Sequence, residues 1–256
     1  MKKLLALVLA IVMIASLTAC AASGAKKVIL GTSADYAPFE FHTMLDGKDT
    51  IVGIDVSVAK AIAADMGAEL EIADMNFENL LTLMAQGNCD FVIAAMEIDD
   101  DRVKNATPSD PYYTDLPAMI VVKAANLDQY NSMEDFNGKV VGAQTGTTKA
   151  SIVTDEMTGA VPSLMTNVVD LLSNLSYDKC DAVVLDGAVA LQAVKSNPEL
   201  AVVEAVPLGE ALPYCVWVQK DDPKGLLPSI NKTIASLVEQ NKLDEFVAEA
   251  DKLSEE

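Results

Sequence analysis

Short apolar runs alternate with helical patterns along the amino-terminal part of the chain. In the clearest helical pattern, Val58, Ile62 and Met66 recur every four residues, and Gly67 follows as a typical stop signal. Residues 91–96 form an unbroken apolar run, which is typical of a strand buried on both faces of a parallel sheet. The alternation predicts a parallel sheet with helices packed on it. In chain order, the predicted elements are a strand at 27–32, a helix at 55–66, a strand at 70–72, a helix at 77–86 and the strand at 91–96.

A second α/β pattern follows residue 115 and repeats the order of the first. The segment DFVIAAM, which starts at Asp90, and the segment DAVVLDG, which starts at Asp181, occupy corresponding places in the two halves. We therefore predict two similar α/β lobes rather than a tandem repeat array. The predicted strands are 116–122, 139–144, 163–167, 181–185 and 213–219, the predicted helices are 147–157, 168–175 and 187–196 with two more at the carboxyl end, and 126–137 is polar and turn-like.

Residues 1–19 are predicted to be a signal peptide, with a basic start and an apolar stretch too short to span a membrane. The stretch ends in Leu-Thr-Ala before Cys20, a pattern that resembles the bacterial lipobox, in which cleavage leaves Cys20 as the lipidated first residue. An ordinary signal cleaved nearby is the alternative. Residues 20–26 would form a flexible tether. We expect an extracytoplasmic protein that is anchored to the cell membrane by lipid on Cys20.

The composition narrows the classes of partner and chemistry. The chain has 38 Asp and Glu residues against 18 Lys and Arg, a net charge of −20, which argues against binding nucleic acid or an anionic membrane surface. Cys89 and Cys180 each precede an apolar strand, so we interpret them as small core residues. His42 is the only histidine, which leaves no histidine cluster for zinc. We expect no metal, no other cofactor and no catalytic residues.

Arg102 is the only arginine in the chain, and it follows the apolar run at 91–96 inside an acidic segment. Ligands of open α/β sheets bind outside the carboxyl ends of the strands, and a planar guanidinium suits a carboxylate. The alternative is that Arg102 only neutralises the aspartates at 99–101 on a solvated turn. Lys would serve that purpose equally well, so the pattern favours a bound carboxylate.

Several motifs, in their order and spacing, give the chain a family resemblance. They are GTSADYAPFEF from Gly31, IVGIDVSVAKAIAADMG from Ile51, residues 90–113, VVGAQTGTT from Val140 and DAVVLDGAVA from Asp181. Together they resemble the bacterial extracellular solute-binding proteins of the polar amino-acid type, family 3, which are the capture subunits of ABC importers. The resemblance covers essentially the whole mature chain.

The resemblance implies an α/β, periplasmic-binding-protein-like fold of type II, with two α/β lobes joined by two hinge strands. By this comparison, lobe 1 comprises residues 27–111 plus 213–256, and lobe 2 comprises residues 116–209. The hinge crossings would lie near residues 112–115 and 210–214, and the lobes would close over the ligand.

The resemblance also assigns ligand-binding roles. Arg102 falls where the family places the arginine that binds the ligand's α-carboxylate. Asp186 falls where an acidic residue binds the α-ammonium. Thr147 and Thr148 lie in a turn that opens a helix, where backbone N–H groups would meet the carboxylate. Binding would then favour closure, because only the closed form pairs both charges of the zwitterion.

Other positions would read the ligand's side chain. Tyr36 and Phe77 match the two positions that sandwich it, and Gln144 is a further position that could face it. Ser33 stands where relatives that bind basic or amide side chains often have Asp. That departure weakens a simple assignment to lysine, arginine or histidine.

Ala95 and Glu97 depart from the family pattern, which often has a glycine and a hydroxyl residue at these places. Either Glu97 helps to bind a cation, or it turns away to pair with a Lys. The resemblance implies that the chain is no enzyme but a substrate-binding subunit. It would capture a polar or cationic amino acid, pass it to an ABC permease and ATPase, and act as a monomer. The alternative from another class is a periplasmic dehydratase-like enzyme with Glu97 as general acid. A receptor ectodomain is a third class, which the short acidic end of the chain disfavours.

Overall fold

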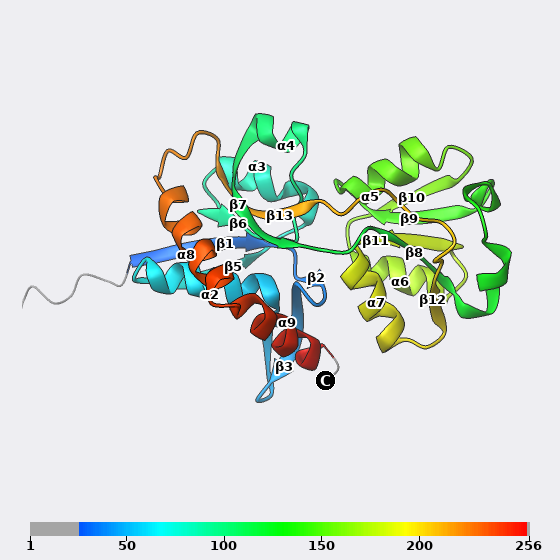
Figure 1. The fold of residues 1–256 in the computed structure, drawn as a ribbon, viewed down its shortest axis with the longest axis horizontal. Coiled ribbons are helices and arrows are strands. Elements are labelled where there is room, and N and C mark those ends of the chain that lie inside the picture. Colours follow the sequence, from blue (N-terminus) through cyan, green and yellow to red (C-terminus); the bar gives the residue numbers. More distant parts are fainter. Residues whose placement is uncertain (1–25, 255–256) are drawn as a thin grey trace, which may run out of the picture.

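The structure, a computed structural model, describes residues 26–254, which form two α/β lobes that lie side by side (Figure 1). The predicted signal peptide, Cys20 and most of the predicted tether lie outside these residues, whereas Lys26 already begins the first strand. Lobe 1 is built on a sheet of order β5-β1-β6-β13-β7, and lobe 2 on a sheet of order β10-β9-β11-β8-β12. Among the described residues, no helix has the length and apolar character needed to cross a membrane.

Lobe 1 follows the predicted alternation of strands and helices. Its first strand pairs in parallel with a strand on each side, because helical connections carry the chain back each time. Leu30, Phe91 and Trp217 are fully buried in its core. The strands are β1 (Lys26–Thr32), β5 (Ala68–Asp74), β6 (Phe91–Val92), β7 (Ala106–Thr114) and β13 (Pro213–Gln219), and the helices are α2 (Ile54–Asp65), η1 (Phe77–Asn79), α3 (Leu80–Ala85), α4 (Asp100–Asn105), α8 (Leu227–Glu239) and α9 (Lys242–Leu253).

Lobe 2 repeats the parallel arrangement around one inserted antiparallel strand. Val183 and Val184 of the central strand are buried, as are Val121 and Val122 of the antiparallel neighbour. The strands are β8 (Met119–Lys123), β9 (Val140–Gln144), β10 (Val161–Met165), β11 (Ala182–Leu185) and β12 (Leu200–Val202), and the helices are η2 (Ala124–Gln129), η3 (Met133–Phe136), α5 (Thr148–Ser151), η4 (Ile152–Glu156), α6 (Val168–Ser176) and α7 (Gly187–Ser196).

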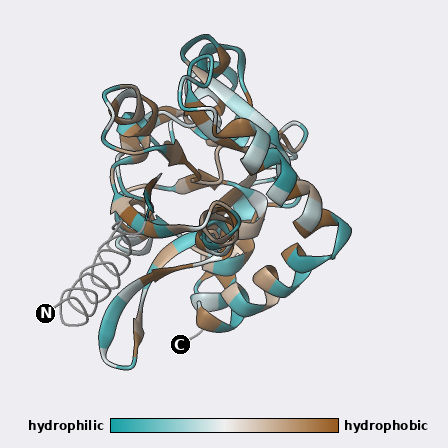
Figure 2. Ribbon diagram, turned by 90° about the vertical axis from the view of Figure 1, so that its left-hand side faces the viewer, coloured by the Kyte–Doolittle hydropathy of each residue, from teal (hydrophilic) through white to brown (hydrophobic). Residues whose placement is uncertain are grey.

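A small sheet of strands β2 (Asp35–Tyr36), β3 (Glu40–Leu45) and β4 (Lys48–Val52) was missed by the hydrophobic pattern. β3 and β4 form a hairpin that projects below lobe 1 in Figure 1, and its tip is hydrophilic in Figure 2. Figure 2 also shows hydrophobic colouring on the central strands of lobe 1. Glu40, Phe41 and Val52 are the buried residues of this hairpin and the rest are exposed or half-buried, so it carries too little apolar periodicity to be recognised as strands.

Two extended crossings connect the lobes, from β7 to β8 and from β12 to β13. They run side by side, because Pro213 and Tyr214 of β13 pair with Thr114 and Tyr113 of β7. Asp115 is buried at this junction, where it accepts a hydrogen bond from the Tyr214 hydroxyl (3.1 Å). It also accepts one from the Ala188 N–H (3.2 Å), which lies in α7 of lobe 2. Asp115 of the first crossing therefore connects the second crossing to helix α7 of lobe 2.

Several predicted elements are shorter than the sequence suggests. Only Phe91–Val92 of the predicted strand at 91–96 pairs in the sheet, and Ala95 turns the chain with a φ of 43°. A glycine adopts this conformation without strain, which accounts physically for a glycine preference at this place. The predicted helix at 77–86 divides into η1 and α3, and the one at 147–157 divides into the four-residue α5 and the π-helical η4. The segment 126–137, which was expected to be turn-like, contains the end of η2 and all of η3.

The three cysteines of the described residues, Cys89, Cys180 and Cys215, are all buried with free thiols. Burial raises the pKa of Cys89 and of Cys180 to about 11 and that of Cys215 to about 12. They pack as small apolar residues, as predicted for Cys89 and Cys180.

Candidate functional site

The lobe 1 side of the site is the turn between β6 and α4. Asp99 caps α4, because its carboxylate accepts hydrogen bonds from the backbone N–H groups of Asp101 and Arg102, each at 2.9 Å. Such a cap satisfies N–H groups that the first helical turn leaves without intrahelical partners. It also fixes the backbone of Arg102 at the start of the helix. The acidic residues beside Arg102 thus have a structural role of their own.

The Arg102 guanidinium is buried and spans the two lobes. It donates from Nη1 to the Glu97 carbonyl oxygen (2.7 Å) and from Nη2 to the Gly146 carbonyl oxygen of lobe 2 (3.1 Å). Its Nε lies 2.9 Å from Asp99 Oδ2, and its Cζ lies 5.5 Å from the centroid of the Phe77 ring. Burial lowers the pKa of Arg102, although the nearby carboxylates raise it, and a guanidinium stays charged in proteins.

Gly146 lets the lobes approach closely at this point. Its φ is +81°, and a Cβ there would meet the Glu78 Cα of lobe 1 at 3.1 Å. A side chain would therefore both strain the turn and push the lobes apart. The close approach is what brings the Gly146 carbonyl within reach of Arg102.

The lobe 2 side of the site is the turn from β9 into α5. The Thr147 hydroxyl caps α5: it accepts from the Ala150 N–H (3.1 Å) and donates to the Gln144 carbonyl (2.7 Å). The Thr148 hydroxyl points across the cleft and donates to Glu97 Oε2. Thr147 therefore shapes the turn, whereas Thr148 contacts the opposite lobe.

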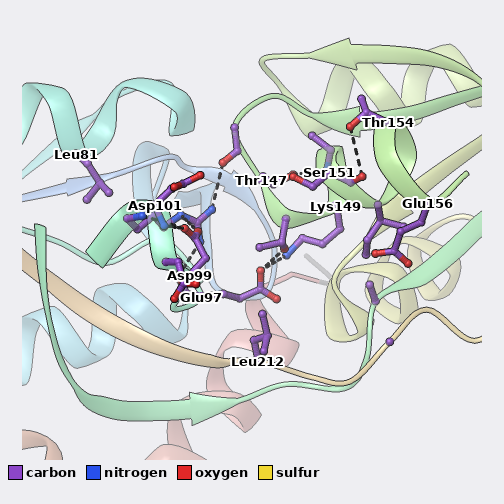
Figure 3. A pocket seen from close by; sticks show the side chains of 18 of the residues that line it. Leu81, Glu97, Asp99, Asp101, Thr147, Lys149, Ser151, Thr154, Glu156 and Leu212 are labelled. Atoms are coloured by element: carbon purple, nitrogen blue, oxygen red, sulfur yellow. Dashed lines mark hydrogen bonds and ion pairs between the residues drawn. The ribbon is translucent and has the colours of Figure 1, made fainter. Parts of the chain in front are cut away.

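A buried ion network lies between the lobes at the centre of the site. The Lys149 ammonium of lobe 2 lies 2.9 Å from Glu97 Oε2 and 2.6 Å from Asp186 Oδ1. These three residues are 4%, 7% and 3% exposed, respectively. The Tyr36 hydroxyl of lobe 1 donates to Asp186 Oδ2 (2.6 Å) and accepts from the Asp186 N–H (3.2 Å). In Figure 3, Lys149 and Glu97 reach toward each other from opposite sides of the cleft.

The sequence left two roles open for Glu97: binding a cation, or turning away to pair with a lysine. Glu97 pairs with a lysine, as in the second alternative, yet it does not turn away from the cleft. The pairing partner, Lys149, belongs to the other lobe and contacts Asp186 as well. Sequence reasoning missed Lys149, although its place directly after Thr147 and Thr148 was a usable signal.

A cavity of about 1220 Å³ opens in front of this network (Figure 3). Glu97, Asp99 and Arg102 line it from lobe 1, residues 146–152 line it from lobe 2, and residues 208–210 line it from the chain leading into β13. The other predicted ligand-binding residues, Tyr36, Phe77, Ala95, Gln144 and Asp186, are buried and do not line this cavity.

Asp35 connects the lobes at the base of the site, and sequence reasoning missed it. Its carboxylate accepts from the Val168 N–H at the start of α6 (2.7 Å) and lies 3.4 Å from the Gln144 amide nitrogen. Gln144 also donates to the Thr166 carbonyl (3.0 Å). Burial raises the pKa of Asp35, which the Val168 N–H opposes. Ser33 donates to Asp35 (3.2 Å) and so supports it indirectly.

The backbone at Ala95 is fixed by the buried carboxylate of Asp55. Asp55, at the start of α2, accepts from the Ala95 N–H (2.6 Å) and from the Tyr112 hydroxyl of β7 (2.7 Å). Burial raises the pKa of Asp55, whereas these two hydrogen bonds lower it. The contact fixes the backbone that leads into Glu97.

Among residues 26–254, no three His, Cys, Asp or Glu side chains lie close enough together to hold a metal ion.

Comparison with known proteins identifies the family. The sequence model of the bacterial extracellular solute-binding proteins, family 3, matches residues 28–249. The arginine-binding extracellular protein ArtP of Bacillus subtilis is 36% identical over 209 residues, which is 78% of this chain and 79% of ArtP. ABC transporter arginine-binding protein 1 of Escherichia coli is 32% identical over 84% of this chain and 87% of that protein.

A solved structure agrees with the sequence comparisons. The substrate-binding protein AbpA of an amino acid ABC transporter from Streptococcus pneumoniae, bound to L-arginine, superimposes with a TM-score of 0.85 at 34% identity. The match covers 90% of this chain and 96% of AbpA. The predicted fold class of two α/β lobes is thereby confirmed. The chain belongs to the bacterial extracellular solute-binding proteins of family 3.

Proposed function

We propose that this protein captures an amino acid between its lobes and delivers it to the permease of an ABC importer. The observation that carries the proposal is the placement of opposite charges on the two sides of one cleft. Arg102 lines the cavity from lobe 1, and Asp186 of lobe 2 lies buried next to Lys149, which lines the cavity from the other side. A zwitterion is the ligand that satisfies both charges at once when closure removes water.

The ligand's carboxylate would bind the Arg102 guanidinium. That group has five N–H donors, and the named contacts with Glu97, Asp99 and Gly146 use three of them. These contacts hold the planar fork in place and supply the preorganisation that a bidentate carboxylate contact needs. The ligand's ammonium would bind Asp186, the acceptor that Lys149 contacts here.

Arginine is the first ligand to test. The cavity is lined by six acidic residues and three basic ones, so its field attracts a ligand with a cationic side chain. The acidic residues are Glu97, Asp99, Asp100, Asp101, Glu156 and Glu210, and the basic ones are Arg102, Lys104 and Lys149. The names of the relatives ArtP and AbpA point in the same direction.

The test is calorimetry on residues 21–256, unfolded and refolded to remove any bound ligand and titrated with the amino acids. We expect binding of L-arginine, and weaker or no binding of agmatine, which keeps the guanidinium but lacks the carboxylate. Equal binding of agmatine would contradict the role of Arg102. If no amino acid binds, the proposed function is wrong.

We also propose the lipid anchor on Cys20, a monomeric state, and the division into residues 27–111 plus 213–256 and 116–209. The pattern Leu-Thr-Ala-Cys supports the anchor. In a bacterial host fed a labelled fatty acid, the unaltered chain should incorporate the label and Cys20→Ala should not. An unaltered chain without label, or equal labelling of the variant, would exclude the anchor on Cys20.

A further inference from the structure

Lys149 is an unusual component of the site, because it is a charged side chain that fills the centre of the cleft. Its ammonium is buried between two carboxylates that come from opposite lobes, 2.9 Å from Glu97 and 2.6 Å from Asp186. Surface lysines are normally solvated, and a buried ammonium is stable only when it is paired and hydrogen-bonded. The two carboxylates meet that requirement. Lys149 is therefore held in place by the same kind of group that binds a free ammonium.

The ligand's ammonium and Lys149 compete for the same carboxylate. Asp186 Oδ1 accepts Lys149 and Oδ2 accepts the Tyr36 hydroxyl. Asp186 itself is 3% exposed and does not line the cavity, whereas Lys149, which contacts it, does. An amino acid whose ammonium binds Asp186 therefore displaces the Lys149 ammonium or lies beside it, and two cations beside one buried carboxylate repel each other.

Glu97 offers Lys149 a partner after this displacement. Its Oε2 accepts both the Lys149 ammonium and the Thr148 hydroxyl. Thr148 and Lys149 are the first two residues of α5, so Thr148 keeps hold of Glu97 when the lysine side chain shifts. Lys149 can thus leave Asp186 without becoming an unpaired buried charge.

We propose that Lys149 is a tethered competitor for the ligand-ammonium position on Asp186 and that Glu97 retains it when the ligand binds. This inference rests on the proposed function, because it concerns the same cleft. It assigns two roles that the resemblance did not: Lys149 sets the affinity, and Glu97 supports binding without contacting the ligand. It also sets selectivity, since a ligand without a free ammonium cannot replace Lys149 on Asp186.

The test compares Lys149→Met with Lys27→Met by calorimetry with the amino acid that the unaltered protein binds. Met keeps the apolar length of the lysine side chain and removes its charge. Lys27 is exposed in β1, lies 3.6 Å from Glu71 and does not line the cavity, so its variant controls for the loss of one positive charge.

We expect Lys149→Met to bind the ligand about tenfold more tightly, because the ligand no longer has to displace an ammonium from Asp186. Lys27→Met should bind within about threefold of the unaltered protein, because exposed pairs contribute little.

Unchanged or weaker binding by Lys149→Met would overturn the proposal, and weaker binding would indicate that Lys149 contacts the ligand directly. Lys149→Met leaves the carboxylates of Glu97 and Asp186 facing each other without a cation. If this variant fails to fold, Lys149→Gln replaces it, because the glutamine amide can donate to both carboxylates without carrying a charge. The same increase in ligand affinity is expected.

Glu97→Gln gives an independent check. With its charge removed, Lys149 depends on Asp186 alone and competes more strongly, so we expect weaker ligand binding. Tighter binding by Glu97→Gln would overturn the retention role. If neither the unaltered protein nor any variant binds an amino acid, the proposed function fails. If the unaltered protein binds one and Lys149→Met binds it no better, only the competition fails.

Discussion

Glu40→Gln should stabilise the folded protein increasingly as the pH rises. Glu40 begins β3, is only 1% exposed, and among the described residues has no hydrogen-bonding group near its carboxyl oxygens other than the Asp55 carboxylate. Burial, followed by the charge of nearby Asp55, raises the pKa of Glu40 well above its ordinary value of 4.5. Asp55 is the member of this pair that favours the charged form, because it accepts hydrogen bonds from Ala95 and Tyr112. We therefore expect Glu40 to hold the proton.

The sign of the effect follows from proton binding. Between the ordinary pKa of 4.5 and the raised pKa of the folded state, the folded protein keeps a proton on Glu40 that the unfolded chain releases. In this window the stability of the unaltered protein falls as the pH rises, by about 1.4 kcal/mol per pH unit for one proton. Above the raised pKa the loss levels off. The amide that Glu40→Gln introduces has no proton to release, so the variant does not suffer this loss.

The measurement is chemical unfolding of both proteins at pH 5, 6, 7 and 8, with the free energy of unfolding extrapolated to water. The advantage of Glu40→Gln should be small at pH 5 and should grow toward pH 8. Glu69→Gln is the matched control, because Glu69 lies in β5 with an exposed side chain. A difference between variant and unaltered protein that stays constant over this range would refute the reasoning about Glu40.

Three further predictions concern the contacts of other residues. Arg102→Lys keeps the charge but loses the planar fork, so amino-acid affinity measured by calorimetry should fall about a hundredfold, and unchanged affinity would contradict the clamp. Burial lowers the pKa of His42, but two hydrogen-bonded aspartates outweigh it and raise that pKa above 6.5. Its stabilising effect is therefore present at low pH and is lost as the pH rises through the raised value. His42→Gln should lower the melting temperature at pH 6 and leave it unchanged at pH 9, and an equal effect at both would exclude this charge effect. The thiols of Cys89, Cys180 and Cys215 should not react with Ellman's reagent at pH 8 until the protein unfolds, because burial raises their pKa values to about 11, 11 and 12. Rapid reaction of the native protein would contradict their burial.

The amino-acid sequence by itself determined the broad architecture. Apolar runs such as 91–96 and 182–185 predict buried strands because their side chains must leave water on both faces of the sheet. The four-residue spacing of Val58, Ile62 and Met66 predicts α2, because i and i+4 share a helix face. The sequence also singled out Arg102 as the only guanidinium, a property of composition that needs no structure. Motif order then indicated the family.

The tertiary structure alone decided which charges meet. Lys149 is 52 residues from Glu97 and 37 from Asp186, and no local pattern specifies those pairs. The same holds for Asp35 and the Val168 N–H, which lie 133 residues apart. Hydrophobic periodicity arises from each element's own geometry, so it can be read along the chain. The partner of a buried charge depends on how the two lobes approach each other, and that is settled only when both are folded.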